Sequence, residues 1–577
     1  MPKALNIPEV KVGRSAFPRT FRDLTTFNNG QLIPLMVDSD IVPGDTVQIP
    51  VSALIRMQTP IYPVMDDMYI DITAWFVPHR LVWKHFKEFW GENNTTYWEQ
   101  PVDYEIPQIK APESTGWAVG SLADYFGLPT GIPEISVSHL PFRAYSLIWN
   151  EFWRDENLKE PIFFNDDETT LTGKNYDSST YDYTTDTQLG ALPARAAKLA
   201  DYFTKALPAP QKGVSTVIPM VQENVPIITT DGVVKDAVKT GIPLKIQFYN
   251  QSGNPVPQTF RAGDYSLGIT EETDRAISKD KYTPVYETGP IQETTSPIST
   301  WAAVPANLFA AMNTNGITVN ALRQAVSIQR YLETIARSGS RYIETLASIF
   351  AVKSSDARLQ RPEFLGGKRI PINMTQVMAN ANAASGTNNK VGNTGAMSQT
   401  IINDYLCTKS FEEHGTLMIL ACCRHERTYQ QGVPRMWLRK KTFDFYNRAL
   451  DHIGETSVYN EEIYAQSEAS GGAGKTYNKQ TFGYQPAFED MRLGRKYVTG
   501  EMRSAATTSL DAWHYADEYN SLPTLSSDWI DENQENVDRT ISVTSATSNQ
   551  LFGDFVFKTI YTRGMSMYGT PGFMDHM

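Results

Sequence analysis

A glycine-rich stretch that ends in lysine and threonine resembles a nucleotide-binding motif. Residues 469–476 read A-S-G-G-A-G-K-T, a phosphate-loop pattern with alanine at the first glycine position. A phosphate loop needs a buried strand before it and a helix after it, so that backbone N–H groups converge on the anion. The flanking sequences, Q-S-E and Y-N-K-Q-T-F-G, predict neither element. We therefore predict a mobile glycine-rich loop here instead of a nucleotide site.

Cysteine and histidine gather in a second stretch that could suggest a zinc site. Cys422, Cys423 and His425 follow one another closely, and Cys407 and His414 lie upstream. Adjacent residues of a strand point to opposite faces, so Cys422 and Cys423 cannot both bind one tetrahedral ion without distortion. No C-x-x-C pair accompanies them. We therefore predict that these cysteines pack as buried apolar side chains.

No sequence signature of a hydrolase or a metalloprotease accompanies these residues. The chain has neither a Gly-x-Ser-x-Gly elbow nor a His-Glu-x-x-His helix, and its eight histidines are scattered. We therefore predict no enzymatic activity, no catalytic residue, no bound metal and no cofactor.

Cations and aromatic rings alternate in one segment, residues 424–448. Seven Lys or Arg side chains stand there against two carboxylates, Glu426 and Asp444, with five aromatic residues between them. Cations can follow phosphates while aromatic faces stack on bases, so the pattern predicts a single-strand binding surface. Arg, Tyr and Trp are also enriched at subunit interfaces, where the cations would pair with carboxylates, and both interpretations stay open. The candidate contact residues are Arg424, Arg427, Arg435, Trp437, Arg439, Lys440 and Lys441.

A tight turn is predicted at Pro43, Gly44 and Asp45. Proline presets φ, glycine tolerates positive φ, and the aspartate side chain can accept local backbone hydrogen bonds. Prolines at positions 34 and 50 flank this turn within apolar stretches. This pattern is typical of short strands between tight turns.

Apolar patterns predict several antiparallel strands. Residues 68–78 alternate between two faces, and residues 415–423 form a continuous apolar run that suits a central strand buried on both faces. β-branched and aromatic residues also cluster at 244–249, 540–545 and 552–561. Antiparallel sheet is therefore the predicted base of the fold.

Helical periodicity interrupts these strands. The predicted helices, each with apolar residues at three-and-four spacing, are 79–92, 143–153, 321–337 and 341–352. The last one leads into an extended segment in which Arg358 and Arg361 precede a proline. The predicted fold class is all-β with helical insertions.

Tryptophan divides the chain into two zones. All eleven tryptophans lie outside residues 154–300, and the stretch 214–300 is rich in threonine and proline. We predict that residues 1–213 and 301–577 form a body and that residues 214–300 form an inserted β-rich subdomain.

The composition bounds the class of protein. The 577-residue chain carries a net charge of −12, which disfavours a nucleic-acid wrapper held by bulk charge. Its three cysteines argue against a disulfide framework and fit a reducing cytoplasm. The N-terminus lacks the apolar run of a signal peptide, and the longest apolar run, residues 417–423, is too short to span a bilayer. We therefore predict no membrane insertion.

Residues 164–190, rich in Asp, Thr, Ser and Tyr, are predicted to be disordered or ordered by a partner.

Long motifs recur along the body in a fixed order. They include T-T-F-N-N-G-Q-L-I-P (25–34), F-V-P-H-R-L-V-W (76–83), R-A-Y-S-L-I-W-N-E-F-W (143–153), L-R-Q-A-V-S-I-Q-R-Y-L-E (322–333) and Y-Q-Q-G-V-P-R-M-W (429–437). Together they closely resemble the major capsid protein of microviruses (Microviridae), small phages with circular single-stranded DNA. The resemblance is to the gokushovirus branch of that family.

The resemblance implies a fold and an assembly. The fold would be an eight-stranded antiparallel jelly roll of the viral capsid type with long loop insertions. Sixty copies would form pentamers and close a T=1 icosahedral capsid around single-stranded DNA. The insertion at residues 214–300 would form protrusions on the threefold axes for attachment to a host surface receptor. The protein would belong to the virion, after assembly in the bacterial host cytoplasm with an internal scaffolding protein and a DNA pilot protein.

The net charge adds one expected partner. Sixty copies of a chain with net charge −12 carry a formal charge of −720 before the polyanionic genome is counted. We therefore predict a small basic DNA-packaging protein, with residues 424–448 as the inner contact of the body. The alternative function is a carbohydrate-binding or hydrolytic sandwich, because jelly rolls also serve lectins and enzymes.

Overall fold

The chain divides into two units. The body comprises Met1–Val214 and Arg330–Met577, and the inserted unit comprises Ser215–Gln329. The inserted unit therefore extends past the tryptophan-free stretch that ends at residue 300. The computed structural model describes residues 13–90, 92, 104–213, 227–229, 246–249, 255–256, 302–305, 308–310, 319–338, 348, 360–380, 391–392, 394–469 and 472–567.

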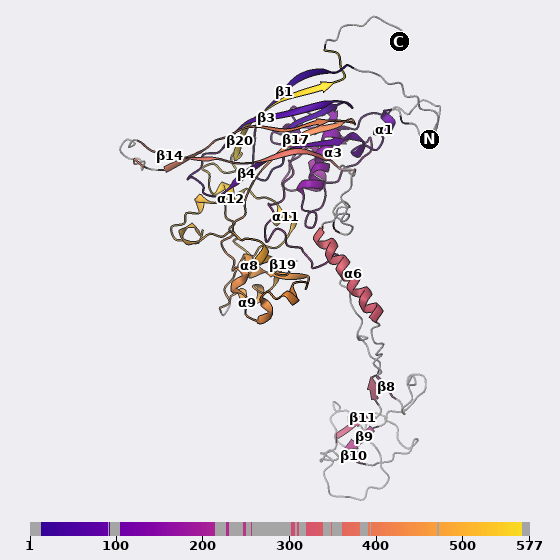
Figure 1. The fold of residues 1–577 in the computed structure, drawn as a ribbon, viewed down its shortest axis with the longest axis vertical. Coiled ribbons are helices and arrows are strands. Elements are labelled where there is room, and N and C mark those ends of the chain that lie inside the picture. Colours follow the sequence, from indigo (N-terminus) through magenta and orange to yellow (C-terminus); the bar gives the residue numbers. More distant parts are fainter. Residues whose placement is uncertain are drawn as a thin grey trace, which may run out of the picture. The chain divides into compact units, whose positions relative to one another are not determined.

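Two four-stranded sheets form the centre of the body, and neighbouring strands in both are antiparallel (Figure 1). The first sheet has the order β1 (Ser15–Phe27), β20 (Leu551–Arg563), β3 (Thr46–Met57) and β16 (Thr400–Ser410). The second has the order β13 (Glu363–Pro371), β4 (Met68–Pro78), β17 (Gly415–His425) and β2 (Ile33–Ile41). The predicted antiparallel base of the fold is confirmed, and the strands predicted at 68–78, 415–423 and 552–561 are β4, β17 and β20.

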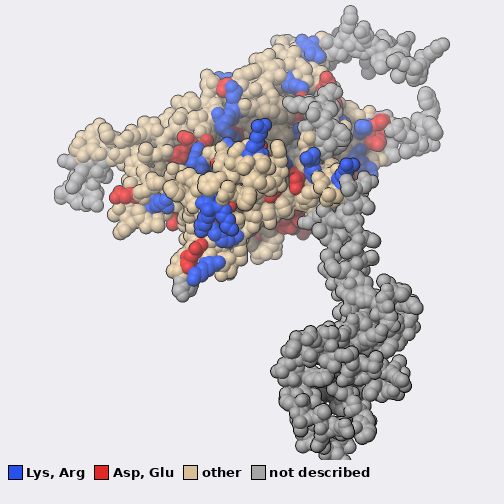
Figure 2. Space-filling model, turned by 60° about the horizontal axis from the view of Figure 1, so that its bottom comes forward, with Lys and Arg blue, Asp and Glu red and all other residues tan. Residues whose placement is uncertain are grey.

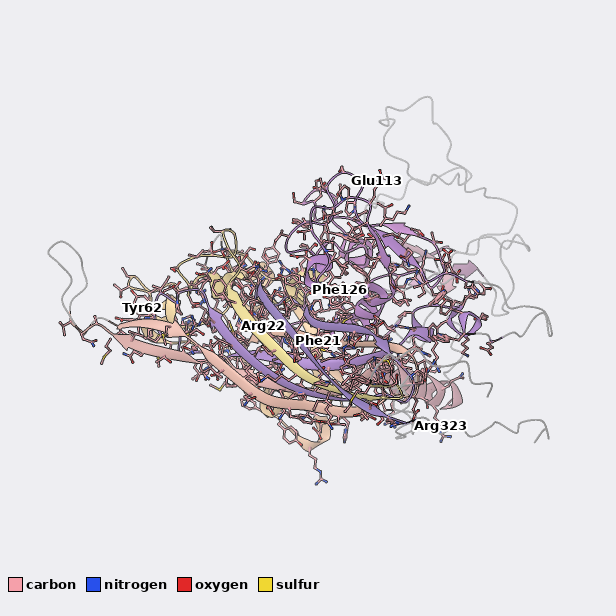
Figure 3. All side chains as sticks on the ribbon, turned by 90° about the horizontal axis from the view of Figure 1, so that it is seen from above. Phe21, Arg22, Tyr62, Glu113, Phe126 and Arg323 are labelled. Carbon is pink, nitrogen blue, oxygen red and sulfur yellow. The ribbon has the colours of Figure 1, made fainter. Side chains whose placement is uncertain are left out.

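The main core lies between the two sheets. β3 and β20 alternate between buried and more exposed residues, up to Tyr561 in β20, as strands with one covered face do. Their inward side chains, such as Val51 and Phe557, join Ile70, Ile72 and Ile419 from the second sheet in one apolar cluster. Seen from above, the strands of the body curve side by side, with Phe21 and Arg22 on β1 (Figure 3).

A second apolar cluster covers the outer face of the second sheet. Trp75, Leu420 and Cys422 point into it and meet α3 (Leu140–Ile148) and the helical turn η2 (Trp149–Trp153). β4 and β17 are consequently covered on both faces, which explains the continuous apolar run of β17. The helix predicted at 143–153 is confirmed by α3 and η2.

The two adjacent cysteines of β17 separate as predicted. Cys423 lies in the cluster between the sheets, whereas Cys422 lies in the outer cluster. Burial raises the pKa of the Cys422 thiol to about 12 and that of Cys423 well above its ordinary value. Both thiols therefore stay protonated and pack as apolar groups.

A tight turn carries the chain from β2 in one sheet to β3 in the other. The Asp45 N–H donates to the Val42 carbonyl (3.0 Å), and Gly44 takes the positive φ of 91° that suits glycine. The Asp45 carboxylate accepts from the Val42 N–H (3.0 Å) and pairs with Arg563 (2.6 Å). Pro43 and Gly44 thus occupy the central positions of the turn, and Asp45 ties it to β20.

A two-stranded ribbon leaves the sandwich between β13 and β16. It consists of β14 (Met374–Met378) and β15 (Thr394–Ser398), paired in antiparallel register with Thr375 opposite Met397. Figure 1 shows β14 projecting beyond the other strands of the body.

The remaining elements of the body are short. The strands are β5 (Gln108–Lys110), β6 (Ser136–Ser138), β7 (Leu171–Thr172), β18 (Glu455–Tyr459) and β19 (Thr481–Pro486). The helices are α1 (Phe86–Phe89), α2 (Leu122–Tyr125), α4 (Tyr183–Asp186), α8 (Asn460–Ile463), α9 (Gly474–Tyr477), α10 (Glu489–Arg492), α11 (Ser527–Ile530) and α12 (Glu535–Asp538). The helix predicted at 79–92 is reduced to a turn at His79–Leu81 and to α1.

Two sequence predictions for the body are wrong. Residues 164–190, predicted to be disordered or ordered by a partner, fold against their own chain and contain β7 and α4. Their polar side chains make local turns, since the Asp182 carboxylate accepts from the Thr184 N–H (2.9 Å), and Asp186 is buried. Residues 540–545, predicted as a strand, follow α12 with a single bridge from Ile541 to Pro60. Their β-branched side chains serve packing there, because Thr540 and Ile541 are buried.

The inserted unit contains small antiparallel sheets. β9 (Ile246–Tyr249) lies between β10 (Pro255–Val256) and β11 (Ala302–Pro305), and β8 (Ile227–Thr229) pairs with β12 (Leu308–Ala310). β9 confirms the strand predicted at 244–249.

One long helix joins the two units along the chain. α6 (Val319–Ser338) confirms the helix predicted at 321–337. The helix predicted at 341–352 lies outside the described residues except for Ser348, as does Arg358. Arg361 is described, and its guanidinium lies over the Phe152 ring (5.1 Å). None of the helices in the described ranges is long and apolar enough to cross a membrane.

Candidate functional site

The segment 424–448 begins at the end of β17 and continues through three short helical turns. These turns are η5 (Arg435–Trp437), η6 (Thr442–Asp444) and η7 (Arg448–Leu450). The structure divides the seven cations of the segment into two groups. Arg424, Arg427, Arg435 and Arg439 pair with carboxylates of the same chain, whereas Lys440, Lys441 and Arg448 lie on the surface.

Arg424 belongs to an ion triad on the outer face of the second sheet. Its guanidinium and that of Arg369 both pair with the Asp71 carboxylate, at 2.5 and 2.6 Å. Burial alone would raise the pKa of Asp71, but the hydrogen bond from Arg369 and the charge of Arg424 hold it below its ordinary value. Arg424 also donates to the Ala197 carbonyl (3.1 Å) and lies over the Trp153 ring (4.9 Å). The triad and these contacts fix the end of β17 against Trp153 and Ala197.

Arg427 is the centre of a buried charge cluster. It pairs with Asp517 (2.9 Å) and with Glu532, and Glu532 also lies 2.7 Å from the Nδ1 atom of His425. Burial opposes ionisation of both carboxyls, yet the charge of Arg427 keeps the pKa of Asp517 at about 2 and holds that of Glu532 well below its ordinary value. The Glu532 carboxylate further accepts from the Asn29 side-chain amide (2.9 Å). This cluster therefore joins segments from the two ends of the chain.

Arg435 and Arg439 anchor the following turns. Arg435 pairs with Glu462 (2.9 Å) and donates to the Ser457 carbonyl (2.6 Å). Arg439 pairs with Asp490 (2.6 Å). These pairs position the chain that lies between them.

An exposed loop, residues 436–448, carries the rest of the cations and most of the aromatic rings. The Asp444 carboxylate accepts from the N–H groups of Lys440 and Lys441 (2.8 Å each), which fixes the turn and directs both ammonium groups outward. Trp437 is 70% and Phe443 78% exposed. Phe445, Tyr446 and Arg448 are exposed as well. On the face drawn in Figure 2, Lys and Arg are interspersed with Asp and Glu instead of forming one cationic surface.

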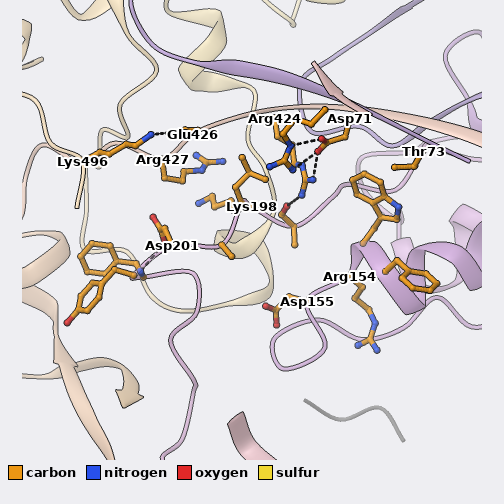
Figure 4. Close-up of a pocket in the computed structure, with 18 of the residues that line it drawn as sticks. Asp71, Thr73, Arg154, Asp155, Lys198, Asp201, Arg424, Glu426, Arg427 and Lys496 are labelled. Carbon is orange, nitrogen blue, oxygen red and sulfur yellow. Dashed lines mark hydrogen bonds and ion pairs between the residues drawn. The ribbon is translucent and has the colours of Figure 1, made fainter. Parts of the chain in front are cut away.

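A cavity of about 990 Å³ opens beside Arg424 and Arg427 (Figure 4). Arg424 and Arg427 line it together with Lys198 and Arg495, two cations that the sequence analysis did not single out. A second cavity, of about 580 Å³, lies between Arg435, Trp437 and Arg495. No local sequence signal marks Lys198 or Arg495, since each reaches the cavity only through the packing of distant segments.

The glycine-rich stretch has a packing role. A Cβ atom on Gly472 would stand 2.1 Å from the Ser467 carbonyl oxygen, and one on Gly474 would stand 2.4 Å from that of Gln466. Only glycine allows this close approach of two backbone segments. Contrary to the prediction, a helical turn does follow the glycines, but α9 has four residues and the chain before it is not a strand. Within the described ranges, no group of three or more His, Cys, Asp or Glu could hold a metal ion.

Comparison with known proteins decides the family. A family model described as capsid protein (F protein) matches residues 5–573. The chain belongs to this capsid protein family. The resemblance to microvirus major capsid proteins that the sequence motifs indicated is therefore confirmed.

Curated relatives match the capsid chain over nearly its full length. It is 37% identical to capsid protein VP1 of Spiroplasma virus 4, over 97% of this chain and 95% of the relative. It is 34% identical to capsid protein VP1 of Bdellovibrio phage phiMH2K and 32% identical to that of Chlamydia phage 1, each over 98% of this chain and 96% of the relative. The role of the protein is thus structural, in the virion and as a homo-oligomer. The family favours this structural role over the alternative of a carbohydrate-binding or hydrolytic sandwich.

Proposed function

We propose that this capsid protein, of the gokushovirus type, folds as a jelly roll. Sixty copies of it, grouped in pentamers, close a T=1 shell around single-stranded DNA. The order of the strands carries the proposal. Numbered along the chain, the eight strands of the sandwich stand in the orders 1-8-3-6 and 5-4-7-2. Nearly every successive strand therefore changes sheet, which is the connectivity of two interlocked Greek keys.

The ribbon formed by β14 and β15 supports contact between copies. An isolated two-stranded hairpin is at best marginally stable in water. Both faces of this ribbon carry exposed apolar residues, with Val377 and Met397 on one and Met378 on the other. Residues 372–399 contain a single charged residue, Lys390, although 20% of the chain is charged. Low charge is typical of the core of an interface, and unprotected strand edges readily pair with another chain. We infer that the ribbon docks on a neighbouring copy.

Packaging partners follow from the charge of the assembly. A shell of sixty chains with net charge −12 cannot neutralise its own genome, so a small basic DNA-packaging protein is part of the proposal. A DNA pilot protein, an internal scaffolding protein and assembly in the bacterial host cytoplasm complete it. Within the body, the exposed loop 436–448 is the candidate contact for single-stranded DNA or for a neighbouring subunit.

The inserted unit is proposed as the threefold protrusion that binds a host surface receptor. Deletion of residues 220–295 should leave shells that electron microscopy shows to be closed. Adsorption of the deleted particles to host cells should fall to the background level, because the proposed receptor surface is gone. Normal adsorption would exclude the attachment role, whereas purified full-length protein that stays monomeric under virion-like conditions would refute the shell.

Changing Lys440, Lys441 and Arg448 to Ser should weaken the binding of single-stranded DNA. Each lost phosphate contact should also lower the slope of log affinity against log salt by about 0.7. Filter binding of a labelled homopolymer at several salt concentrations measures both quantities. The matched control changes three exposed lysines outside this loop, Lys84, Lys87 and Lys110, to Ser.

The outcome of this test separates the two roles of the loop. Unchanged DNA binding with impaired assembly would assign the loop to a subunit interface. Unchanged DNA binding and unchanged assembly would remove the loop from both roles.

A further inference from the structure

We infer that the cavity beside Arg424 is a binding site for a phosphate group, centred on Lys198 and Arg495. The cavity, of about 990 Å³, is within the size range of small-ligand sites. Seven cationic and four anionic side chains line it. An excess of cations in a concave site favours an anionic ligand.

Every carboxylate in the lining already has donors from the chain. Asp71 is shared by Arg369 and Arg424, and Glu426 pairs with Lys496. Two further carboxylates complete the set. Asp155 accepts from the N–H groups of Asn157 (2.9 Å) and Leu158 (3.0 Å), and Asp201 accepts from Tyr429 and from the N–H groups of Phe203 (2.9 Å) and Thr204 (2.8 Å).

Lys198 has no comparable partner. The residue is only 8% exposed, and its ammonium lies 4.2 Å from the centre of the Trp529 ring. Among the described residues, no oxygen accepts a hydrogen bond from this ammonium. Figure 4 shows Lys198 between Arg427 and Asp201 at the cavity. An ammonium with unused donors that faces a cavity must take its acceptors from water or from a bound ligand.

Arg495 is the second cation without a carboxylate. Its guanidinium donates to the Glu462 backbone carbonyl and lies 5.2 Å from the centre of the Phe203 ring, and no described carboxylate stands within 4 Å. Burial lowers the pKa of Arg495 below its ordinary value despite the more distant Glu462, yet an arginine stays charged at neutral pH. Lys198 and Arg495 line the same cavity as Asp201 and Phe203, and the guanidinium of Arg495 lies over the Phe203 ring.

The electrostatics of Lys198 fit a site for an anion. Burial, followed by the charge of Arg427, lowers the pKa of Lys198 to about 8, although Asp517, Glu532 and Asp201 oppose the shift. Asp517 and Glu532 lie behind the lining and are paired with Arg427. A bound oxyanion would supply the acceptors and restore the ordinary pKa of the ammonium.

Phosphate suits this site better than a carboxylate ligand does. Its oxygens point in several directions, so one phosphate can accept from an ammonium and a guanidinium at the same time. The phosphate could be a free ion or a phosphodiester of single-stranded DNA, and both present the same oxyanion to Lys198 and Arg495. The site does not depend on shell formation, so it can be tested on the unassembled full-length subunit.

Calorimetric titration with inorganic phosphate at constant ionic strength tests the site. We expect one saturable site per subunit and at least a tenfold loss of affinity in each of the variants Lys198→Met and Arg495→Met. Lys198→Met removes no hydrogen bond and keeps the length of the side chain, so folding should be retained. Lys205→Met, an exposed lysine outside the cavity, is the control and should bind phosphate as the unmodified protein does.

Two further measurements define the ligand. Sulfate keeps its charge across the neutral and alkaline range, so its affinity should fall as the pH rises through about 8, where Lys198 loses its proton. A thymidine trinucleotide that binds more tightly than phosphate and loses affinity in Lys198→Met would identify the DNA backbone as the source. Weaker trinucleotide binding would identify free phosphate. The inference is overturned if phosphate does not saturate a site, or if Lys198→Met and Arg495→Met bind it as well as the control does.

Discussion

Replacing Arg427 by methionine is expected to lower the free energy of unfolding of the body by about 3–5 kcal/mol. The guanidinium is buried between Asp517 and Glu532, so its removal takes away the main compensating charge of two buried carboxylates. Methionine fills a similar volume, which limits the effect of a cavity. Denaturant unfolding followed by tryptophan fluorescence measures the loss. The matched control is Arg22→Met, because Arg22 on β1 pairs with Asp554 on β20 (2.8 Å) while the side chain of Arg22 is 65% exposed. An exposed pair of this kind contributes little to stability, because solvent screens the two charges.

The pH dependence of this loss distinguishes charge from packing. Arg427 depresses the pKa of Asp517 to about 2, so the stabilisation is fully present above the unfolded pKa of about 4 and is lost as the pH falls towards 2. Without Arg427, burial raises the pKa values of the two carboxyls. They then take up protons as the pH falls below neutrality, which removes the cost of burying their charges in the variant. The difference between the variant and the unmodified protein should therefore shrink between pH 7 and pH 4. A constant difference over this range would assign the loss to packing alone.

The double variant Val377→Asp, Met397→Asp is expected to abolish shell assembly while leaving the subunit folded. Both side chains lie on one face of the β14–β15 ribbon and are about half exposed, at 47% and 48%. A carboxylate there is solvated in the free subunit, so folding should be unaffected. Burial of the same carboxylates in an interface carries a desolvation penalty of several kcal/mol per ion, and every copy in a shell repeats it. The yield of closed particles should therefore fall by about 100-fold or more.

Sedimentation and electron microscopy of the purified protein measure this yield. Val119→Asp is the matched control, because Val119 is an exposed apolar residue in a loop outside the ribbon. Circular dichroism and unfolding curves establish that the variants are folded. Particles at the normal yield from the double variant would show that the ribbon does not lie in a subunit interface.

Local patterns let the sequence determine much of the sandwich. A strand has a period of two, so the alternation in β4 indicated which of its residues share a face, and the continuous apolar run of β17 indicated a strand covered on both faces. The covering of both faces of β4 was not predicted. The same rule placed Cys422 and Cys423 on opposite faces of β17. The ordered motifs identified the capsid family, because these short stretches carry the resemblance by themselves.

Long-range packing decided the candidate site. Asp71 and Arg424 are 353 residues apart in the chain, and Arg427 is 90 and 105 residues from Asp517 and Glu532. The sequence therefore showed seven cations in one segment but not which of them are neutralised inside the protein. Residues 164–190 were misjudged for a related reason, since polar side chains that cap turns have the composition of a disordered segment.

The sequence by itself determined the class of fold, the family and the faces of the main strands, because hydrophobic periodicity and turn chemistry act between near neighbours. The tertiary structure alone decided which cations pair, which stay exposed in the loop 436–448, and that Lys198 and Arg495 meet in one cavity. Ion pairing depends on distance and burial in space, and no spacing along the chain encodes either quantity.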